Sequence, residues 1–300
     1  AASDVYKRQA WMFAKAFWDA GVPKEALQVI ITRREALKVL TTAPAIKHII
    51  LTGGTDTAQN IAKANPTTPL SAETGGKNVI ILTASGDRDH AIMNIVTSAF
   101  GNAGQKCSAC SLLLVERSVY EDENFRSKLK DAATSLKTGS VWNAGNIVGP
   151  MITNKNDKLL QAFNLEPGES WLVPPHFIDH REYILAPTVK WGVKPESFSF
   201  RTELFGPLLS VACIENLEEG IKLVNGLDYG LTSGLQSLDE KEQKLWKNSV
   251  MAGNLYINRG ITGAIVNRQP FGGMKLSAFG GGIKAGGPNY CTCLLYTSPS

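Results

Sequence analysis

The sequence predicts an α/β protein whose sheets are built largely of parallel strands. Short runs rich in β-branched residues alternate with segments of helical periodicity along most of the chain. In addition, the apolar run that ends at Thr52 leads at once into the turn at residues 53–55, which opens a helical segment. A strand that passes through a tight turn into a helix is typical of the crossover between parallel strands.

The first part of the chain begins this alternation. Apolar residues recur at helical spacing over residues 11–20, and the segment 21–23 ends that helix because its proline cannot continue it. The runs LQVIIT at 27–32 and IKHIILT at 46–52 are predicted to be buried strands. A helical segment from residue 34 separates them.

The rest of the chain continues in the same order. The predicted strands cover residues 77–82, 111–116, 208–214, 232–237 and 254–258. The predicted helices cover residues 87–100, 121–136, 217–225 and 239–251. Between residues 136 and 208 the chain is rich in Pro and Gly, and HFIDH at 176–180, which follows two prolines, is predicted to be a loop.

The composition excludes several classes of protein. With 43% hydrophobic and 19% charged residues, the chain is typical of a globular protein, and no apolar run approaches the roughly 20 residues of a membrane helix. The net charge of +4 is small and the basic residues are scattered, which disfavours nucleic acid or a membrane surface as a partner. Five cysteines without regular spacing argue against a disulfide framework and favour a reducing cytoplasm.

Both ends of the chain differ in pattern from their neighbours. Residues 1–9 and 294–300 do not continue the adjacent periodicity, and we expect them to be foreign to the native protein. The chain is therefore expected to be a fragment. Cys291 and Cys293 lie so close to the second of these segments that they carry little weight.

The most specific stretch is FGNAGQKCSACSLLLVE, which contains Cys107 and Cys110. A metal site there would need a second pair of ligands. His176 and His180 have i, i+4 spacing, but they follow two prolines and enclose no acidic general base, so this pair is predicted to lie in a loop. In a thioredoxin-like dithiol the cysteines follow a strand and precede a helix, whereas here the order is reversed. A single nucleophile remains, with Cys107 in the turn and Cys110 as a packed, inert thiol, although a lone cysteine is more often a small buried hydrophobic residue.

Two glutamates and one glycine-rich segment accompany Cys107. Glu73 precedes a double glycine, Glu203 precedes a Phe-Gly-Pro turn, and QPFGGMKLS covers 269–277. Alone, Glu73 fits a solvated loop residue, but next to a thiol it fits a base that activates water. None of these features is specific by itself.

The ordered set LTGGT, ETGGK, GQKC, ELFGP and PFGGMKLS resembles the aldehyde dehydrogenase superfamily from about residue 11 to residue 290. The resemblance implies part of a Rossmann-type NAD-binding domain in residues 1–72 and an α/β catalytic domain with parallel sheets in residues 73–266. Residues 267–293 would then form a return segment that closes the active site.

The resemblance also implies a mechanism. Cys107 would attack an aldehyde to form a hemithioacetal, NAD would take a hydride, and Glu73 would activate the water that cleaves the resulting thioester. Glu203 would hold the nicotinamide ribose and Phe205 would pack beside it. The implied cofactor-binding residues are Thr52, Gly53, Gly54, Thr55, Thr74, Glu203 and Phe205, and no metal is expected.

The segments RGITGAIVNRQPFGG and KAGGPNY are most similar to L-glutamate γ-semialdehyde (Δ1-pyrroline-5-carboxylate) dehydrogenases, and to the dehydrogenase half of bifunctional proline utilization A above all. This similarity implies that the backbone at Gly263 and Ala264, with the hydroxyl of Ser108, anchors the substrate carboxylate, while Phe271 packs on its aliphatic chain. It favours a homo-oligomer and leaves open a proline dehydrogenase domain fused to the full-length protein.

Several features depart from the family pattern. The family's oxyanion asparagine and ribose-binding lysine belong to a segment that precedes the first helix here. Gly54 stands where Ser is usual, and Ala278 where Gly is common. We therefore expect the 300-residue chain to be inactive or unstable alone.

Other functions stay open at this point. An aldehyde dehydrogenase of another specificity has the same motifs. A cofactor-free cysteine hydrolase or acyltransferase would need a histidine near Cys107, where the sequence has none. A metal-binding or noncatalytic binding module is the remaining alternative.

Overall fold

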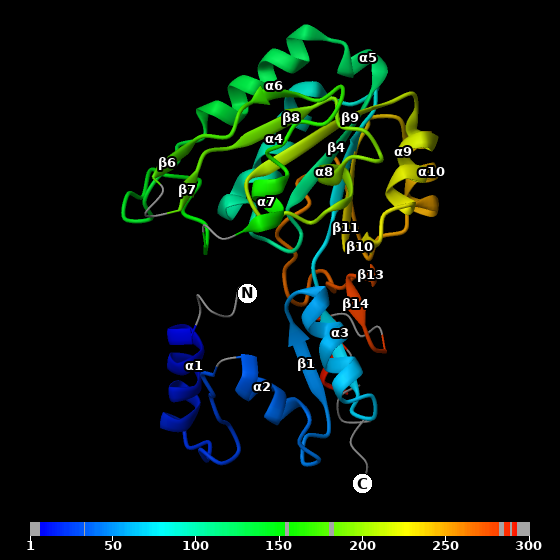
Figure 1. Ribbon diagram of the computed structural model, residues 1–300. Coiled ribbons are helices and arrows are strands. Elements are labelled where there is room, and N and C mark those ends of the chain that lie inside the picture. The colour runs from blue at the N-terminus through cyan, green and yellow to red at the C-terminus, as the bar shows by residue number, and fades with distance from the viewer. Residues whose placement is uncertain are drawn as a thin grey trace.

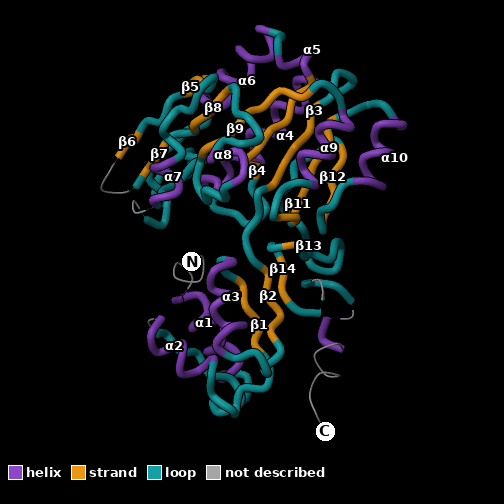
Figure 2. The backbone as a smooth tube through the Cα atoms, turned by 45° about the vertical axis from the view of Figure 1, so that its right-hand side comes forward, coloured by secondary structure: helices purple, strands orange, loops and turns teal. Residues whose placement is uncertain are grey.

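Two sheets, one small and one large, organise the chain in the computed structural model (Figure 1). The structure describes residues 7–32, 34–153, 156–179, 183–281, 285–288 and 290–292. The small sheet has the order β1-β2-β14, built from β1 (Ile49–Thr52), β2 (Leu70–Glu73) and β14 (Ala278–Phe279). Figure 2 shows this sheet below the large one, with the chain passing from β2 directly up into β3.

The large sheet has seven strands in the order β12-β11-β3-β4-β9-β8-β5. Its strands are β3 (Asn78–Leu82), β4 (Cys110–Glu116), β5 (Ser170–Val173), β8 (Thr188–Trp191), β9 (Leu208–Ile214), β11 (Thr232–Gln236) and β12 (Asn254–Ile257). All neighbours pair in parallel except β5 and β8. Alternate side chains of β3 enter two hydrophobic clusters, with Ile80 and Leu82 in one and Val79 and Ile81 in the other. Burial on both faces explains the continuous apolar runs of the sequence.

Helices cover both faces of the large sheet, and others flank the small one (Figures 1 and 2). They are α1 (Lys7–Asp19), α2 (Arg34–Thr41), α3 (Thr55–Ala64), α4 (Arg88–Phe100), α5 (Arg117–Tyr120), α6 (Glu123–Ser135), α7 (Asp157–Gln161), α8 (Phe198–Arg201), α9 (Leu217–Asn225) and α10 (Glu240–Ser249), with the 3₁₀ turn η2 (Gly101–Gly104) after α4. Polar N-caps set several starts: Asp87, for example, accepts hydrogen bonds from the backbone N–H groups of Asp89 and His90. Among the described residues, no helix is long and apolar enough to cross a membrane.

The α/β prediction is confirmed, together with most of its elements. The predicted strand at 46–52 shortens to β1, and the later predicted strands and helices each correspond to an observed element within a few residues. Short strands without a periodic pattern escaped prediction; they include β2, β10 (Tyr229–Gly230), β13 (Met274–Lys275) and β14.

Two local predictions were wrong. Residues 27–32 form no strand, and Ile30 and Ile31 are 57% and 60% exposed. An apolar run forms a strand only where a neighbour satisfies its backbone, and within the described residues this run has no ladder partner. The predicted loop at 176–180 instead contains β6 (Phe177–Asp179), paired with β7 (Ile184–Leu185), because a three-residue antiparallel ladder needs no long pattern. His180 lies outside the described residues.

The segment that returns from the large sheet ties the two sheets together. Thr74 donates its backbone N–H to the carbonyl of Ser277 and its hydroxyl to the carbonyl of Leu276, at 3.0 and 2.5 Å. Leu276 in turn donates its N–H to Asp228, and β14 pairs with β2. The start of the linker that follows Glu73 is therefore held to the return segment by two hydrogen bonds of Thr74.

Candidate active site

Cys107 lies in a tight loop between α4 and β4. Asn102, Ala103 and Gly104 have left-handed backbone conformations, with φ of 56°, 53° and 66°. A side chain at Gly104 would collide with the carbonyl oxygen of Gly206, so this position needs glycine both for its φ and for its space. A left-handed, buried alanine costs backbone energy, and such strain is typical of functional loops.

Gln105 anchors this loop to a neighbouring segment. Its Oε1 accepts a hydrogen bond from the N–H of Ile152 at 2.8 Å, and its Nε2 donates to the carbonyls of Asn102 and Pro150 at 3.3 Å. One side chain thus ties the turn to residues 150–152, which explains why an amide stands two positions before the cysteine.

The thiol of Cys107 is half-buried and lies in the field of two carboxylates. Burial is the main cause that raises its pKa, and the charges of Glu203 and Glu73 raise it further. Hydrogen bonds from the backbone N–H groups of Ser108 and of Cys107 itself oppose this rise, since they favour the anion. The same pair of N–H groups can stabilise negative charge that develops beside the sulfur.

Cys110 is a different kind of thiol. It is 1% exposed within β4, and burial raises its pKa to about 12. The prediction that Cys110 is a packed thiol is confirmed, and its lack of reactivity stays a prediction. Among the described residues, no group of three or more His, Cys, Asp or Glu side chains could hold a metal ion.

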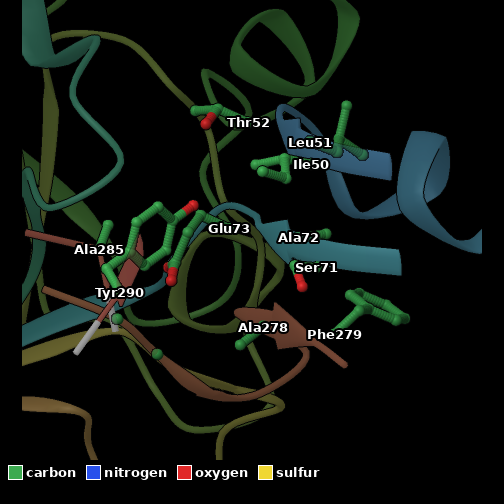
Figure 3. Close-up of a pocket in the computed structure, with 12 residues that line it drawn as sticks. Ile50, Leu51, Thr52, Ser71, Ala72, Glu73, Ala278, Phe279, Ala285 and Tyr290 are labelled. Atoms are coloured by element: carbon green, nitrogen blue, oxygen red, sulfur yellow. The ribbon is translucent and has the colours of Figure 1, made fainter. Parts of the chain in front are cut away.

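Glu73 is the last residue of β2, where the small sheet ends. Parallel pairing places it opposite Thr52 of β1, and antiparallel pairing places it opposite Ala278 of β14. Its side chain lines a pocket with about 510 Å³ of space free of protein atoms, part of it open to solvent. Figure 3 shows Glu73 and Tyr290 pointing into this pocket, with Thr52 at its upper rim.

Glu203 binds the double glycine that follows Glu73. The N–H of Gly76 donates to Oε1 of Glu203 at 2.9 Å, and a Cβ added at Gly75 would overlap the same carboxylate. The pKa of Glu203 is raised, mainly by burial, while the Gly76 hydrogen bond and the charges of Lys158 and Lys77 oppose the rise. These contacts explain the two glycines of ETGGK: the N–H of Gly76 binds the carboxylate of Glu203, and the absence of a side chain at Gly75 leaves space for that carboxylate.

Phe205 lies beside Glu203 in a second, smaller recess. Its φ of 49° is left-handed, which a bulky residue adopts rarely. The recess has about 240 Å³ of space free of protein atoms, and Gly76, Lys106 and Gly206 also line it. The two residues implied to contact a nicotinamide ribose therefore share one surface.

The turn after β1 leads into α3. Gly53 donates its N–H to the carbonyl of Glu73 at 3.1 Å, and Gly54 is the N-cap of α3 without a side-chain cap. A Cβ at Gly54 would meet nothing within 4 Å, so the space in front of this helix is open. The hydroxyls of Thr55 and Thr74 both donate to the carbonyl of Leu276. An uncapped helix N-terminus with open space fits the phosphates of a dinucleotide.

The predicted substrate residues are brought together only in part. Ser108 is 6% exposed and adjoins Cys107, and its carbonyl accepts a hydrogen bond from Thr232 at 3.5 Å. Gly263 is exposed with φ of +97°, and Ala264 follows it on the same loop. Phe271 donates its N–H to Ala285 in the return segment. The approach of Gly263, Ala264 and Phe271 to the substrate stays a prediction.

Sequence reasoning missed three polar residues near the site. Lys77 is 3% exposed, its Nζ donates to the carbonyl of Ser111 at 3.1 Å, and burial lowers its pKa to about 7. Asn78 is 1% exposed and bonds to the Cys107 loop. Tyr229 forms a hydrogen bond with Thr55, and its pKa is raised mainly by burial and further by Glu203. The sequence did contain a signal for Lys77 and Asn78, because they are two polar residues directly before the apolar run VIIL.

The fold and the site define a two-sheet α/β protein whose half-buried thiol at Cys107 is influenced by the charges of two glutamates, Glu73 and Glu203. The model of the aldehyde dehydrogenase family matches residues 3–298. The chain belongs to the aldehyde dehydrogenase family, and its fold is the aldehyde dehydrogenase fold.

Three similar proteins indicate which aldehyde dehydrogenases this chain resembles. The 1-pyrroline-5-carboxylate dehydrogenase of Geobacillus kaustophilus is 32% identical over 292 residues, which are 94% of this chain and 56% of the relative. The structure of proline utilization A from Corynebacterium freiburgense is 42% identical, with a TM-score of 0.91 over 96% of this chain and 30% of that one. The 1-pyrroline-5-carboxylate dehydrogenase from Thermus with bound NAD is 30% identical, with a TM-score of 0.86 over 94% of this chain and 57% of that one. The chain thus spans about half the length of the curated relatives it matches.

Proposed function

We propose that this chain is part of an NAD-dependent dehydrogenase that oxidises L-glutamate γ-semialdehyde to L-glutamate in proline catabolism. The observation that carries the proposal is the linker of residues 73–78, which begins with Glu73, binds the carboxylate of Glu203 through the N–H of Gly76 at 2.9 Å, and binds the carbonyl of Cys107 through Asn78 at 2.7 Å. The substrate in this proposal is taken from the similar proteins, which are named 1-pyrroline-5-carboxylate dehydrogenase.

The chemistry follows from these groups. After the thiol of Cys107 loses its proton to water, its sulfur bonds to the aldehyde carbon and the π electron pair of the carbonyl moves to the oxygen. The N–H groups of Cys107 and Ser108 stabilise the resulting negative oxygen of the hemithioacetal. NAD, when bound, supplies the acceptor for the hydride that leaves this carbon. Glu73 then takes a proton from water, the water oxygen bonds to the thioester carbon, and the carbon–sulfur bond breaks to release the acid.

The residues present fit such a cofactor. The open N-terminus of α3 at Gly53, Gly54 and Thr55 would hold the diphosphate, and Glu203 with Phe205 would hold the nicotinamide ribose. Two threonines lie next to Glu73: Thr52 is opposite it on the neighbouring strand β1, and Thr74 follows it in the linker. Both would also contact the cofactor. For the substrate, Ser108, Gly263 and Ala264 would bind the carboxylate and Phe271 the aliphatic chain.

Substitutions in the full-length protein test the roles. Cys107→Ser should abolish NADH formation, while Glu73→Gln should permit about one equivalent of NADH per site and then stall, because hydrolysis of the thioester lacks its base. Cys213→Ser serves as the control, since Cys213 is a half-buried thiol on β9 outside the site. Unchanged steady-state turnover by Glu73→Gln would show that the base is another group.

A panel of aldehydes tests the substrate. The proposal expects L-glutamate γ-semialdehyde to be oxidised with a higher kcat/KM than unsubstituted aliphatic aldehydes of similar length, because a buried carboxylate needs matched donors. A higher kcat/KM for the simple aldehydes would contradict the proposed substrate but would leave the proposed reaction, the oxidation of an aldehyde, unchanged.

We also propose a cytoplasmic location, a homo-oligomer, and a proline dehydrogenase domain in the full-length protein. The cysteine usage supports the first, and the similarity to bifunctional proline utilization A supports the last. The oligomer rests on the family resemblance. Cell fractionation, sedimentation of the purified protein and recovery of the upstream sequence test the three points.

A further inference from the structure

The side chain of Asn78 is hydrogen-bonded to the backbone of Cys107 itself and of Ala109, two residues further on. Asn78 begins β3 and is 1% exposed. Its Nδ2 donates to the carbonyl of Cys107 at 2.7 Å and to the carbonyl of Ala109 at 3.0 Å. Its Oδ1 accepts a hydrogen bond from the N–H of Thr232 on β11 at 3.0 Å. One buried amide therefore joins the Cys107 loop to two strands of the large sheet.

An irregularity in the sheet makes this side chain necessary. Asn78 pairs with Cys110, but the next pair joins Val79 to Leu112, so Ser111 is an extra residue in β4. The backbone that precedes the bulge lies beyond the regular ladder and needs other partners. Asn78 supplies them for the carbonyls of Cys107 and Ala109, and Lys77 supplies one for Ser111.

The same short linker holds the other two candidate groups. Gly76 binds Glu203 through its N–H, and a Cβ at Gly76 would lie 2.6 Å from Oδ1 of Asn78 and 3.0 Å from the carbonyl of Cys107. Residues 73–78 thus carry Glu73 at one end, bind Glu203 in the middle, and hold Cys107 at the other end. Contact distances along this linker decide where the three groups stand relative to one another.

We propose that Asn78 is a positioning residue that sets the place of the Cys107 sulfur and of the N–H groups beside it. The inference rests on the proposed function in that Cys107 is taken as the nucleophile. Asn78 touches neither substrate nor cofactor in this role. It acts through the carbonyl of Cys107, and a shift of about 1 Å at a reacting group can lower the rate about 100-fold.

Asn78→Asp tests this in the full-length protein with little change of shape. Aspartate keeps an acceptor for the N–H of Thr232, but it presents oxygen in place of Nδ2 to the carbonyls of Cys107 and Ala109. Asn78→Ser is the second variant, because it removes the bidentate contact without adding charge. The matched control is Asn94→Asp: Asn94 is 8% exposed, and its Nδ2 donates to Gln236 at 3.1 Å, away from the Cys107 loop.

Two readouts separate positioning from stability. The first is kcat and KM for aldehyde oxidation; the second is the rate at which iodoacetamide alkylates Cys107, followed by mass spectrometry. Both Asn78 variants should lose about 10- to 100-fold in kcat with KM for NAD within about twofold of wild type, and both should alkylate at a changed rate. Asn94→Asp should match wild type in both readouts at a similar loss of Tm.

Three outcomes would overturn the inference. If the Asn78 variants fold and have the same kcat and the same rate of Cys107 alkylation as Asn94→Asp, the hydrogen bonds from Asn78 to the Cys107 loop do not position the thiol. Loss of the folded state in both Asn78 variants, but not in Asn94→Asp, would make Asn78 a structural residue only. A fall in kcat matched by Asn94→Asp would mean a general effect. Because alkylation needs no aldehyde oxidation, it tests Asn78 even if the proposed reaction fails, and Cys107→Ser tests that reaction separately.

Discussion

Gly75 is the position where one added methyl group should have a calculable effect on the site. A Cβ at this residue would overlap the carboxylate of Glu203, while the neighbouring N–H of Gly76 holds that carboxylate at 2.9 Å. In Gly75→Ala the side chain of Glu203 must therefore rotate away and give up this hydrogen bond. A hydrogen bond to a charged group contributes about 1.5 to 3 kcal/mol.

If Glu203 holds the nicotinamide ribose, this loss appears in cofactor binding. At about 1.4 kcal/mol per factor of ten, we expect the Kd for NAD to rise about 10- to 150-fold in Gly75→Ala. Titration calorimetry of the full-length protein measures this change. Gly101→Ala is the control, because Gly101 has φ of −54° and a Cβ there meets nothing within 4 Å.

A double-mutant cycle with Glu203→Ala makes the test specific. Once the carboxylate is gone, the methyl group of Gly75→Ala has no side chain to displace, and its effect on Kd should largely vanish. An equal loss of NAD affinity in the Glu203→Ala background would refute the reasoning, since the methyl group would then act on the backbone and not through the carboxylate.

Two further predictions concern charge. Glu203→Gln removes a negative charge that raises the pKa of Cys107, so iodoacetamide should alkylate Cys107 faster than in wild type at a fixed neutral pH; an equal or slower rate would contradict the electrostatic assignment. Burial lowers the pKa of Lys77 to about 7, whereas the pKa of a lysine in the unfolded chain is about 10.5. The unfolded chain therefore binds more protons between these two pH values, and the free energy of unfolding rises with pH across that window. Denaturant unfolding should show a free energy of unfolding about 2 kcal/mol higher near pH 9 than near pH 7, and Lys77→Met should remove most of this slope. An identical slope in the variant would mean that Lys77 keeps its ordinary pKa in the folded protein.

Long apolar runs made the large sheet predictable. Strands such as β3 and β4 are buried on both faces, so nearly every residue in them is apolar and the run is visible in the sequence. Residues 27–32 show the limit of the same rule: their run is as apolar, but its isoleucines are exposed and no ladder forms along it among the described residues. Hydrophobicity marks what can be buried, whereas a strand also needs a partner for its backbone.

In the candidate site, the sequence identified some residues, whereas the contacts between them were visible only in the structure. The motifs named Cys107, Glu73 and Glu203 because each stands beside glycines that leave a sequence signal. Nothing in the sequence showed that Gly76 binds Glu203, or that Gln105 and Asn78 clamp the Cys107 loop. Such contacts join residues far apart in the chain, and an amide side chain bonded to a carbonyl has no periodic pattern to reveal it.

The sequence by itself determined the class of fold, the set of candidate reactive groups and the prediction that Cys107 and Cys110 differ in character. The fold class depends on the periodicity of the chain, and the candidate groups depend on motifs whose order resembles the aldehyde dehydrogenase family; a single chain displays both. The tertiary structure alone decided how the groups are coupled, since it is the six-residue linker 73–78, crossing between two sheets, that brings Glu73, Glu203 and Cys107 into one arrangement. That arrangement depends on close backbone approach at Gly75 and Gly76 and on a bulge in β4, which exist only once the sheets have packed.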